Sequence, residues 1–322
     1  MQSLIRGLLI YSVLIITGCS SVVEYQILQA NSYEFDADIL EQFKGELSLE
    51  KRTFCIQINE CFPYIYAPKN TQSESLNTTF SMNFTGTEFE SSLSLQRNEL
   101  PEVKGNVLII HGFMGSKEWM VTTAAYFQFL GLNVYLVDLL GHGENTRDKG
   151  FGVLDIPFLS RFVLDEIEAD VPLYIVGNSM GSLPTLALAE AEHVKGIILQ
   201  APMIRFDQAV PAYVNDRNAW YASFLSNDSL RQGAFAALQA RKIRAEQTDI
   251  ADALLNARKP VLIFASSTDN VSPYRLWKGF ENEYVDIVQV EQREHAYMSM
   301  IGQSEHVAIN SWLKLLMSSS TN

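Results

Sequence analysis

The chain has 322 residues, 47% of them hydrophobic and 19% charged, which is enough for one large α/β domain with additional segments and a sizeable core. Its formal net charge is −13 and its isoelectric point is about 4.9. So acidic a chain repels polyanions, and this excludes nucleic acid as an expected partner.

The N-terminal segment has the features of an export signal. Arg6 precedes a short apolar run at residues 8–16, and small residues follow that run up to Cys19. A basic residue, a short apolar run and small residues before a cleavage point describe a secretory signal peptide. The run is shorter than the roughly 20 residues that cross a bilayer. An ordinary cleaved signal with an incidental cysteine, or an uncleaved anchor, would explain the same pattern.

Residues 16–19, Ile-Thr-Gly-Cys, resemble the bacterial lipobox. In that motif the cysteine becomes the lipidated first residue of the mature protein. The resemblance implies a signal peptide at residues 1–18, lipid attachment at Cys19 and a membrane partner through that lipid. By similarity to the enterobacterial sorting pattern, Ser20 implies the outer membrane of a bacterial cell envelope.

Residues 19–75 form an expected N-terminal extension, acting either as a spacer or as a segment packed on the main domain. Residues 53–58 alternate like a strand, residues 61–64 have turn character, and residues 69–75 are polar like a loop. In an exported protein, Cys55 and Cys61 are close enough to form a disulfide, although two buried free thiols are the alternative. The nearest histidine is His111, so we expect no metal site here.

A regular alternation of strands and helices begins near residue 76. The apolar run at residues 107–110 is typical of a strand buried on both faces. The alternation predicts one α/β domain over residues 76–319, with a mostly parallel sheet covered by helices on both faces. Strand signals lie at residues 80–85 and 88–95 (joined by a turn at Gly86), 107–110, 134–137, 173–176, 197–199, 261–265 and 285–290, and helix signals at 119–130, 159–167, 180–191 and 302–317.

The alternation stops between two of the later strands. Residues 202–258 mix charge, short helical stretches and aromatic side chains, and this is too long for a plain connection. We therefore expect a helical lid over the active site at residues 202–258. Its aromatic residues are Phe206, Tyr213, Trp220, Tyr221 and Phe224.

The strongest chemical signal is Gly177-Asn178-Ser179-Met180-Gly181, which stands between a predicted strand and a predicted helix. This context is the one that a nucleophile elbow requires, because glycines let the backbone turn sharply and present the serine hydroxyl. The helix N-terminus behind the turn favours negative charge. Ser179 is therefore the expected nucleophile.

An acid and a base follow at the ends of later strands. Asp269 lies after residues 261–265 and His295 after residues 285–290, so both side chains are expected at the sheet edge that carries Ser179. For the acid, Asp286 and Glu294 are the alternatives. His193 and His306 are poorly placed for catalysis, and we expect them at the surface.

The order Ser179, Asp269, His295 is that of the α/β-hydrolases. Residues 106–145, with His111-Gly112-Phe113-Met114-Gly115 and Asp-Leu-Leu-Gly-His-Gly at 138–143, resemble their monoacylglycerol lipase, lysophospholipase and serine aminopeptidase branch. The resemblance covers about residues 80–317 and implies the α/β-hydrolase fold. In this fold the backbone N–H groups of Phe113 and Met180 would form the oxyanion hole. His111 and His142 would be structural.

The chain departs from those relatives at three places: the N-terminal signal and extension, the lid, and Asn178, where relatives often carry histidine. The expected activity is hydrolysis of a carboxylic ester, lipid-like or with a medium-length acyl chain, as a small-molecule substrate. No metal or organic cofactor is needed for that chemistry. The alternatives are an aminopeptidase or amidase of the same fold and a non-catalytic surface-binding lipoprotein.

Overall fold

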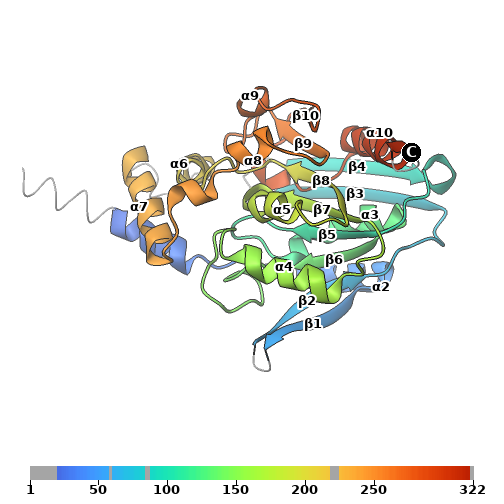
Figure 1. The fold of residues 1–322 in the computed structure, drawn as a ribbon, viewed down its shortest axis with the longest axis horizontal. Coiled ribbons are helices and arrows are strands. Elements are labelled where there is room, and N and C mark those ends of the chain that lie inside the picture. The colour runs from blue at the N-terminus through green and yellow to red at the C-terminus, as the bar shows by residue number, and fades with distance from the viewer. Residues whose placement is uncertain (1–19, 58–59, 84–87, 218–224, 320–322) are drawn as a thin grey trace, which may run out of the picture.

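The core of the molecule is an eight-stranded sheet in the order β1-β2-β6-β5-β7-β8-β9-β10 (Figure 1). The computed structural model describes residues 20–57, 60–83, 88–217 and 225–319. All the pairings from β6 to β10 are parallel, whereas β1–β2 and β2–β6 are antiparallel. The strands are β1 (Glu50–Gln57), β2 (Glu60–Ala67), β5 (Asn106–Ile110), β6 (Asn133–Val137), β7 (Leu173–Asn178), β8 (Val194–Gln200), β9 (Val261–Ser266) and β10 (Val285–Val290).

Alternate residues of the parallel strands enter two separate hydrophobic clusters, one on each face of the sheet. In β5, Leu108 and Ile110 pack on one face, and Val107 and Ile109 on the other. This is why these strands appear in the sequence as continuous apolar runs. The first face is covered by α4 (Asp155–Glu166) and α5 (Ser182–Leu188), and the second by α3 (Val121–Phe129) and α10 (Gln303–Ser319).

Two further elements lie over the second face. The strands β3 (Ser75–Asn83) and β4 (Glu88–Gln96) pair with each other in a separate two-stranded sheet, and Leu93 and Leu95 join the cluster beneath α3 and α10. The predicted turn at Gly86 lies outside the described residues. The helix α2 (Ala37–Leu47) packs against α3, and its N-terminus is capped by the Asp36 side chain.

The turn expected at residues 61–64 is corrected by the structure, and the hairpin that precedes residue 76 packs on the main domain. Residues 61–64 belong to β2, and β1 and β2 extend the central sheet, so the sheet begins at Glu50. Pro63 gives this strand its turn-like composition, but pairing with β6 starts only at Tyr64, so Pro63 has no neighbour on that side. Phe54 and Phe62 pack on Phe158 of α4, which explains why this hairpin is not a free spacer.

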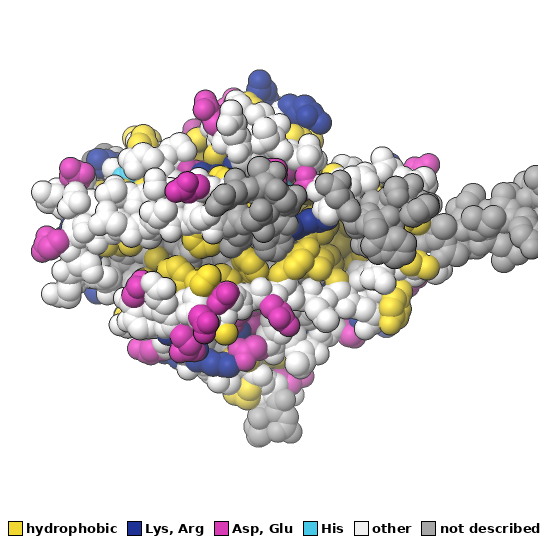
Figure 2. All heavy atoms as spheres, turned by 180° about the vertical axis from the view of Figure 1, so that it is seen from behind, with side chains coloured by type: hydrophobic (Ala, Val, Ile, Leu, Met, Phe, Trp, Pro, Cys, Tyr) yellow, Lys and Arg dark blue, Asp and Glu magenta, His cyan; other side chains and the backbone are white. Residues whose placement is uncertain are grey.

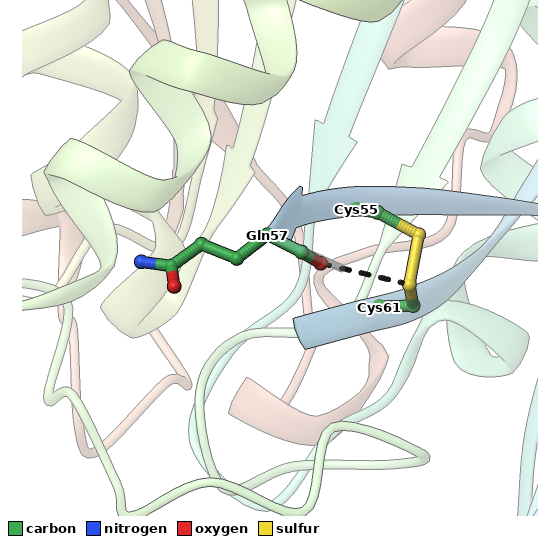
Figure 3. Close-up of a disulfide and its surroundings, with 3 residues drawn as sticks. All are labelled: Cys55, Gln57 and Cys61. Atoms are coloured by element: carbon green, nitrogen blue, oxygen red, sulfur yellow. Dashed lines mark hydrogen bonds between the residues drawn. A yellow bond between two sulfur atoms is a disulfide. The ribbon is translucent and has the colours of Figure 1, made fainter. Parts of the chain in front are cut away.

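A disulfide joins the two strands of this hairpin. Cys55 and Cys61 are paired in the register of β1 and β2, and their sulfur atoms are bonded (Figure 3). The Gln57 carbonyl oxygen lies 4.0 Å from Cys61 Sγ, and because a disulfide sulfur has no proton, this is a contact only.

The segment between β8 and β9 is helical, as expected of the lid. It contains α6 (Phe206–Asp216), α7 (Asn227–Ala240) and α8 (Ala251–Leu255), and Figure 1 shows α6 and α7 gathered at one end of the sheet. Of its aromatic residues, Phe206 and Tyr213 are described, whereas Trp220, Tyr221 and Phe224 lie outside the described residues. This segment also contains the short helix η5 (Ala245–Thr248). The short helices elsewhere are η1 (Arg97–Glu99), η2 (Lys117–Met120), η3 (Ser179–Gly181), η6 (His295–Tyr297) and α9 (Tyr274–Trp277).

The described chain begins with a helix at residues 20–29, which lies beside α7 (blue in Figure 1). Cys19 and the expected signal peptide at 1–18 lie outside the described residues. Within the described ranges, no helix combines the length and the apolar character needed to cross a bilayer.

Candidate active site

The expected nucleophile occupies a strained turn between β7 and α5. Ser179 has a φ of +48°, a left-handed conformation that is costly for a residue with a side chain. The turn is possible because of its glycines. A Cβ on Gly177 would lie 2.4 Å from Thr185 Oγ1, and a Cβ on Gly181 would lie 2.5 Å from the Ile110 carbonyl oxygen. These close approaches fix both glycines of the elbow sequence.

The expected base and acid meet this serine in one chain of hydrogen bonds. Ser179 Oγ lies 2.9 Å from His295 Nε2, and His295 Nδ1 lies 2.8 Å from Asp269 Oδ2. The other oxygen of Asp269 accepts hydrogen bonds from the backbone N–H groups of Val271 and Ser272, each 2.8 Å long. Asp269 is buried, so these bonds hold its carboxylate toward the imidazole. The three residues come from the carboxyl ends of β7, β9 and β10.

Neither alternative acid occupies this position. Asp286 lies within β10 with an exposed side chain, and Glu294 directly precedes His295 on η6. Two residues before His295, the buried Arg293 pairs with Glu305 and donates a 2.6 Å hydrogen bond to the Met300 carbonyl oxygen. This pairing anchors the loop that presents the imidazole, and the sequence carried no signal for it.

The expectation that His306 lies at the surface is wrong. His306 is buried on α10, where Nδ1 lies 3.0 Å from the hydroxyl oxygen of the buried Tyr126. Burial lowers the pKa of His306 because it disfavours the charged ring. His193 is half-buried at the start of β8. Neither ring takes part in the Ser179–His295–Asp269 chain.

The loop after β5 faces the elbow. A Cβ on Gly112 would lie 3.0 Å from the Ser179 Cβ, so the backbone that leads to Phe113 passes directly over the nucleophile. Met180 follows the serine in η3 and is fully buried. His111 Nδ1 donates to the Gly112 carbonyl oxygen (2.7 Å), and His111 Nε2 accepts from the Leu139 N–H (3.1 Å). Burial lowers the pKa of His111, and its neutral ring shapes this loop.

A buried lysine joins the loops after β5 and β6. Lys117 Nζ lies 2.6 Å from Asp138 Oδ2 and 2.7 Å from Glu144 Oε2. Burial alone would lower the Lys117 pKa, but the carboxylates of Asp138 and Glu118 outweigh burial and raise it. A lone lysine after a strand carries no sequence signal for such a role, so sequence reasoning missed it.

Ser179 and His295 open into a large and mainly apolar cavity. Its volume is about 1290 Å³, above the range of about 300–1,000 Å³ that is usual for small-molecule sites. The walls come from the β5 loop, from α6 and α7, and from the N-terminal segment. Figure 2 shows hydrophobic side chains gathered in a hollow on this face, near the N-terminal end of the described chain. Among the described residues no group of His, Cys, Asp and Glu is placed to bind a metal ion.

Comparisons with known proteins agree with this architecture. Residues 101–223 match the family described as "Serine aminopeptidase, S33". The chain is 38% identical over 108 residues to "Probable lysophospholipase BODYGUARD 4" of Arabidopsis thaliana, which covers 31% of this chain and 25% of that protein. It is 28% identical over 113 residues to caffeoylshikimate esterase of the same plant, covering 32% and 34%. The chain thus spans about a quarter to a third of the length of these curated relatives.

Among solved structures, an esterase of Pyrococcus furiosus superimposes with a TM-score of 0.58 over 90% of this chain and 97% of the esterase, at 14% identity. At that identity the likeness concerns the fold. Together with the sheet order and the match at residues 101–223, it confirms the fold that the sequence predicted. The chain has the α/β-hydrolase fold.

Proposed function

We propose that this chain is a serine hydrolase that cleaves a carboxylic ester with a lipid-like or medium-length acyl chain. The observation that carries the proposal is the unbroken chain of hydrogen bonds from Ser179 through His295 to Asp269, placed at the floor of an apolar cavity. The partial match to lysophospholipase and esterase relatives supports the same reaction class.

In the proposed mechanism, His295 Nε2 takes the proton of Ser179 as Oγ bonds to the ester carbonyl carbon. Asp269 accepts a hydrogen bond from Nδ1–H and stabilises the imidazolium that forms. The backbone N–H groups of Phe113 and Met180 would hold the oxyanion. When the bond to the alcohol oxygen breaks, His295 returns the proton to the leaving group, and water then releases the acid from the acyl-enzyme.

An aminopeptidase is the second candidate, since residues 101–223 match a family of that description. Such an enzyme needs a carboxylate to bind a free amino terminus, and Glu34 is an exposed carboxylate on the cavity wall. The apolar character of the other lining residues favours an acyl chain. Comparing p-nitrophenyl acyl esters with aminoacyl p-nitroanilides distinguishes the two, because only an enzyme that binds the free amino terminus would prefer the anilides.

Active-site labelling tests the proposed function. We expect a fluorophosphonate probe to label the full chain in detergent, and we expect no label on the Ser179→Ala variant, since the probe reacts only with an activated serine. The His295→Ala variant should also remain unlabelled, because Ser179 would lack its base. A folded wild-type protein that takes no label would contradict the hydrolase and leave the non-catalytic binding protein as the better proposal.

We also propose that the protein is held in a bacterial cell envelope by a lipid on Cys19, at the outer membrane according to the residue that follows. In a Gram-negative host grown with alkyne-palmitate, wild type should carry the label and sediment with membranes. Cys19→Ala should lose the label and become soluble, because a lipid chain supplies most of the membrane affinity. A Cys55→Ser/Cys61→Ser variant is the matched control and should keep the label. A Cys19→Ala variant that still carries the alkyne-palmitate label and sediments with membranes would refute lipid attachment at Cys19.

A further inference from the structure

The N-terminal segment forms part of the cavity above Ser179. Most residues between Val22 and Glu34 line this cavity, together with Val210 and Val214 of α6 and Leu230 of α7. The segment lies more than a hundred residues before the nucleophile in the sequence. Its place in the wall therefore follows from the fold and not from the catalytic sequences.

Apolar packing holds the helix at residues 20–29 against the lid. Val23 and Ile27 are buried in the same cluster as Leu230, and only 5% and 7% of their surfaces are exposed. A Cβ on Gly233 would lie 2.4 Å from Val23 Cβ, so the glycine lets the two helices approach closely. The buried face of the helix thus belongs both to the core and to the cavity.

Hydrogen bonds fix the chain that follows this helix. The Tyr33 N–H donates to the Met114 carbonyl oxygen (2.8 Å), and Trp119 Nε1 donates to the Tyr33 carbonyl oxygen (2.8 Å). The Tyr33 hydroxyl lies 2.8 Å from the Tyr213 hydroxyl of α6. These bonds tie the segment to the β5 loop on one side of the cavity and to the lid on the other. The wall is therefore fixed at both ends.

Given the ester-hydrolase function proposed above, on which this assignment rests, we propose that residues 20–34 form one wall of the acyl-binding site. The apolar side chains of the helix at residues 20–29 then set the acyl-chain length that the enzyme accepts. The alcohol part of the ester leaves from the Ser179 end, whereas the acyl chain extends between Val23 and Ile27 on one side and Val210 and Leu230 on the other.

The test compares full-length variants across p-nitrophenyl esters from acetyl to dodecanoyl. Ala30→Trp narrows the cavity and should lower kcat/KM for the dodecanoyl ester at least about tenfold relative to the acetyl ester, because the chain loses apolar contacts. Ile27→Ala widens the cavity and should shift the profile toward longer chains. Tyr25→Trp is the matched control on the exposed face of the same helix, outside the lining, and should keep both values within about twofold.

Thermal unfolding identifies a variant that does not fold. If Ala30→Trp does not fold, the chain-length profile of Ile27→Ala provides the test. If the variants fold and react with the fluorophosphonate probe but keep the wild-type dependence of kcat/KM on acyl-chain length, the proposed acyl-binding wall is overturned. Binding of dodecanoate to Ser179→Ala, with and without Ala30→Trp, separates the two proposals because it needs no turnover. If the wild type is inactive, but Ala30→Trp weakens dodecanoate binding at least about tenfold, the proposed hydrolase function is overturned and the acyl-binding wall is retained. Equal dodecanoate binding would overturn the wall alone.

Discussion

Replacing Ser179 by alanine should lower kcat/KM for acyl esters by about four orders of magnitude or more. The variant keeps the cavity but lacks the atom that bonds to the carbonyl carbon. Steady-state hydrolysis of the wild type's best p-nitrophenyl ester, measured beside thermal unfolding, checks the result. Ser179 has a φ of +48°, and because alanine and serine both carry a Cβ, the backbone strain is the same in both and we expect little change in stability.

Ser182→Ala is the matched control for that variant. Ser182 is buried in the next turn, and its hydroxyl donates a long 3.4 Å bond to the Gly177 carbonyl oxygen without contacting His295. The kcat/KM of Ser182→Ala should stay near that of the wild type. Combining Ser179→Ala with His295→Ala should cost little beyond the single change, because the two groups act as a unit. Ester turnover by Ser179→Ala at the wild-type rate would refute the nucleophile.

Asp269→Asn should reduce kcat by about 10⁴-fold. The amide keeps the size of the carboxylate, but it cannot stabilise the imidazolium, and it favours the imidazole tautomer that offers no free Nε2 to the serine. The loss should appear in kcat more than in KM, since Asp269 contacts His295 and lies beneath the cavity surface. Burst and steady-state kinetics on the same ester provide the measurement.

Two carboxylates that the sequence left as alternatives serve as controls for Asp269. Asp286→Asn changes an exposed side chain on β10, and Glu294→Gln changes the residue directly before the base, whereas the ring nitrogens of His295 bond to Ser179 and Asp269. Both variants should retain activity within about threefold. A Glu294→Gln variant as inactive as Asp269→Asn would indicate that the acid has been assigned to the wrong residue.

The fold and the expected site residues could be predicted because each depends on a local pattern. A continuous apolar run of four residues is enough to mark β5, and its carboxyl end fixes where His111 and Phe113 lie. Ser179, Asp269 and His295 stand directly after β7, β9 and β10, and parallel strands bring such positions to one edge. The order of the strands and the positions of their ends therefore predict that these residues lie close together, and the structure adds the hydrogen-bond distances between them.

The remaining features depend on contacts between distant parts of the chain. The hairpin β1–β2 joins the sheet through pairing with β6 and through aromatic contacts with α4, and no local signal of residues 50–67 encodes those partners. The same holds for Lys117, whose burial follows from Asp138 and Glu144, and for the cavity wall at residues 20–34. Sequence periodicity reports burial within one element, not the identity of the element that covers it.

The hairpin also determines what the outer edge of the sheet offers to other molecules. β1 is the terminal strand at one end of the sheet, and its Glu50, Lys51 and Arg52 side chains are exposed, with Arg52 paired to Glu50 and Lys51 paired to Glu144. An edge strand that carries neighbouring side chains of opposite charge is a poor template for strands of other copies, because their approach would desolvate these charges. At high local density, such an edge disfavours intermolecular β-sheet growth and aggregation.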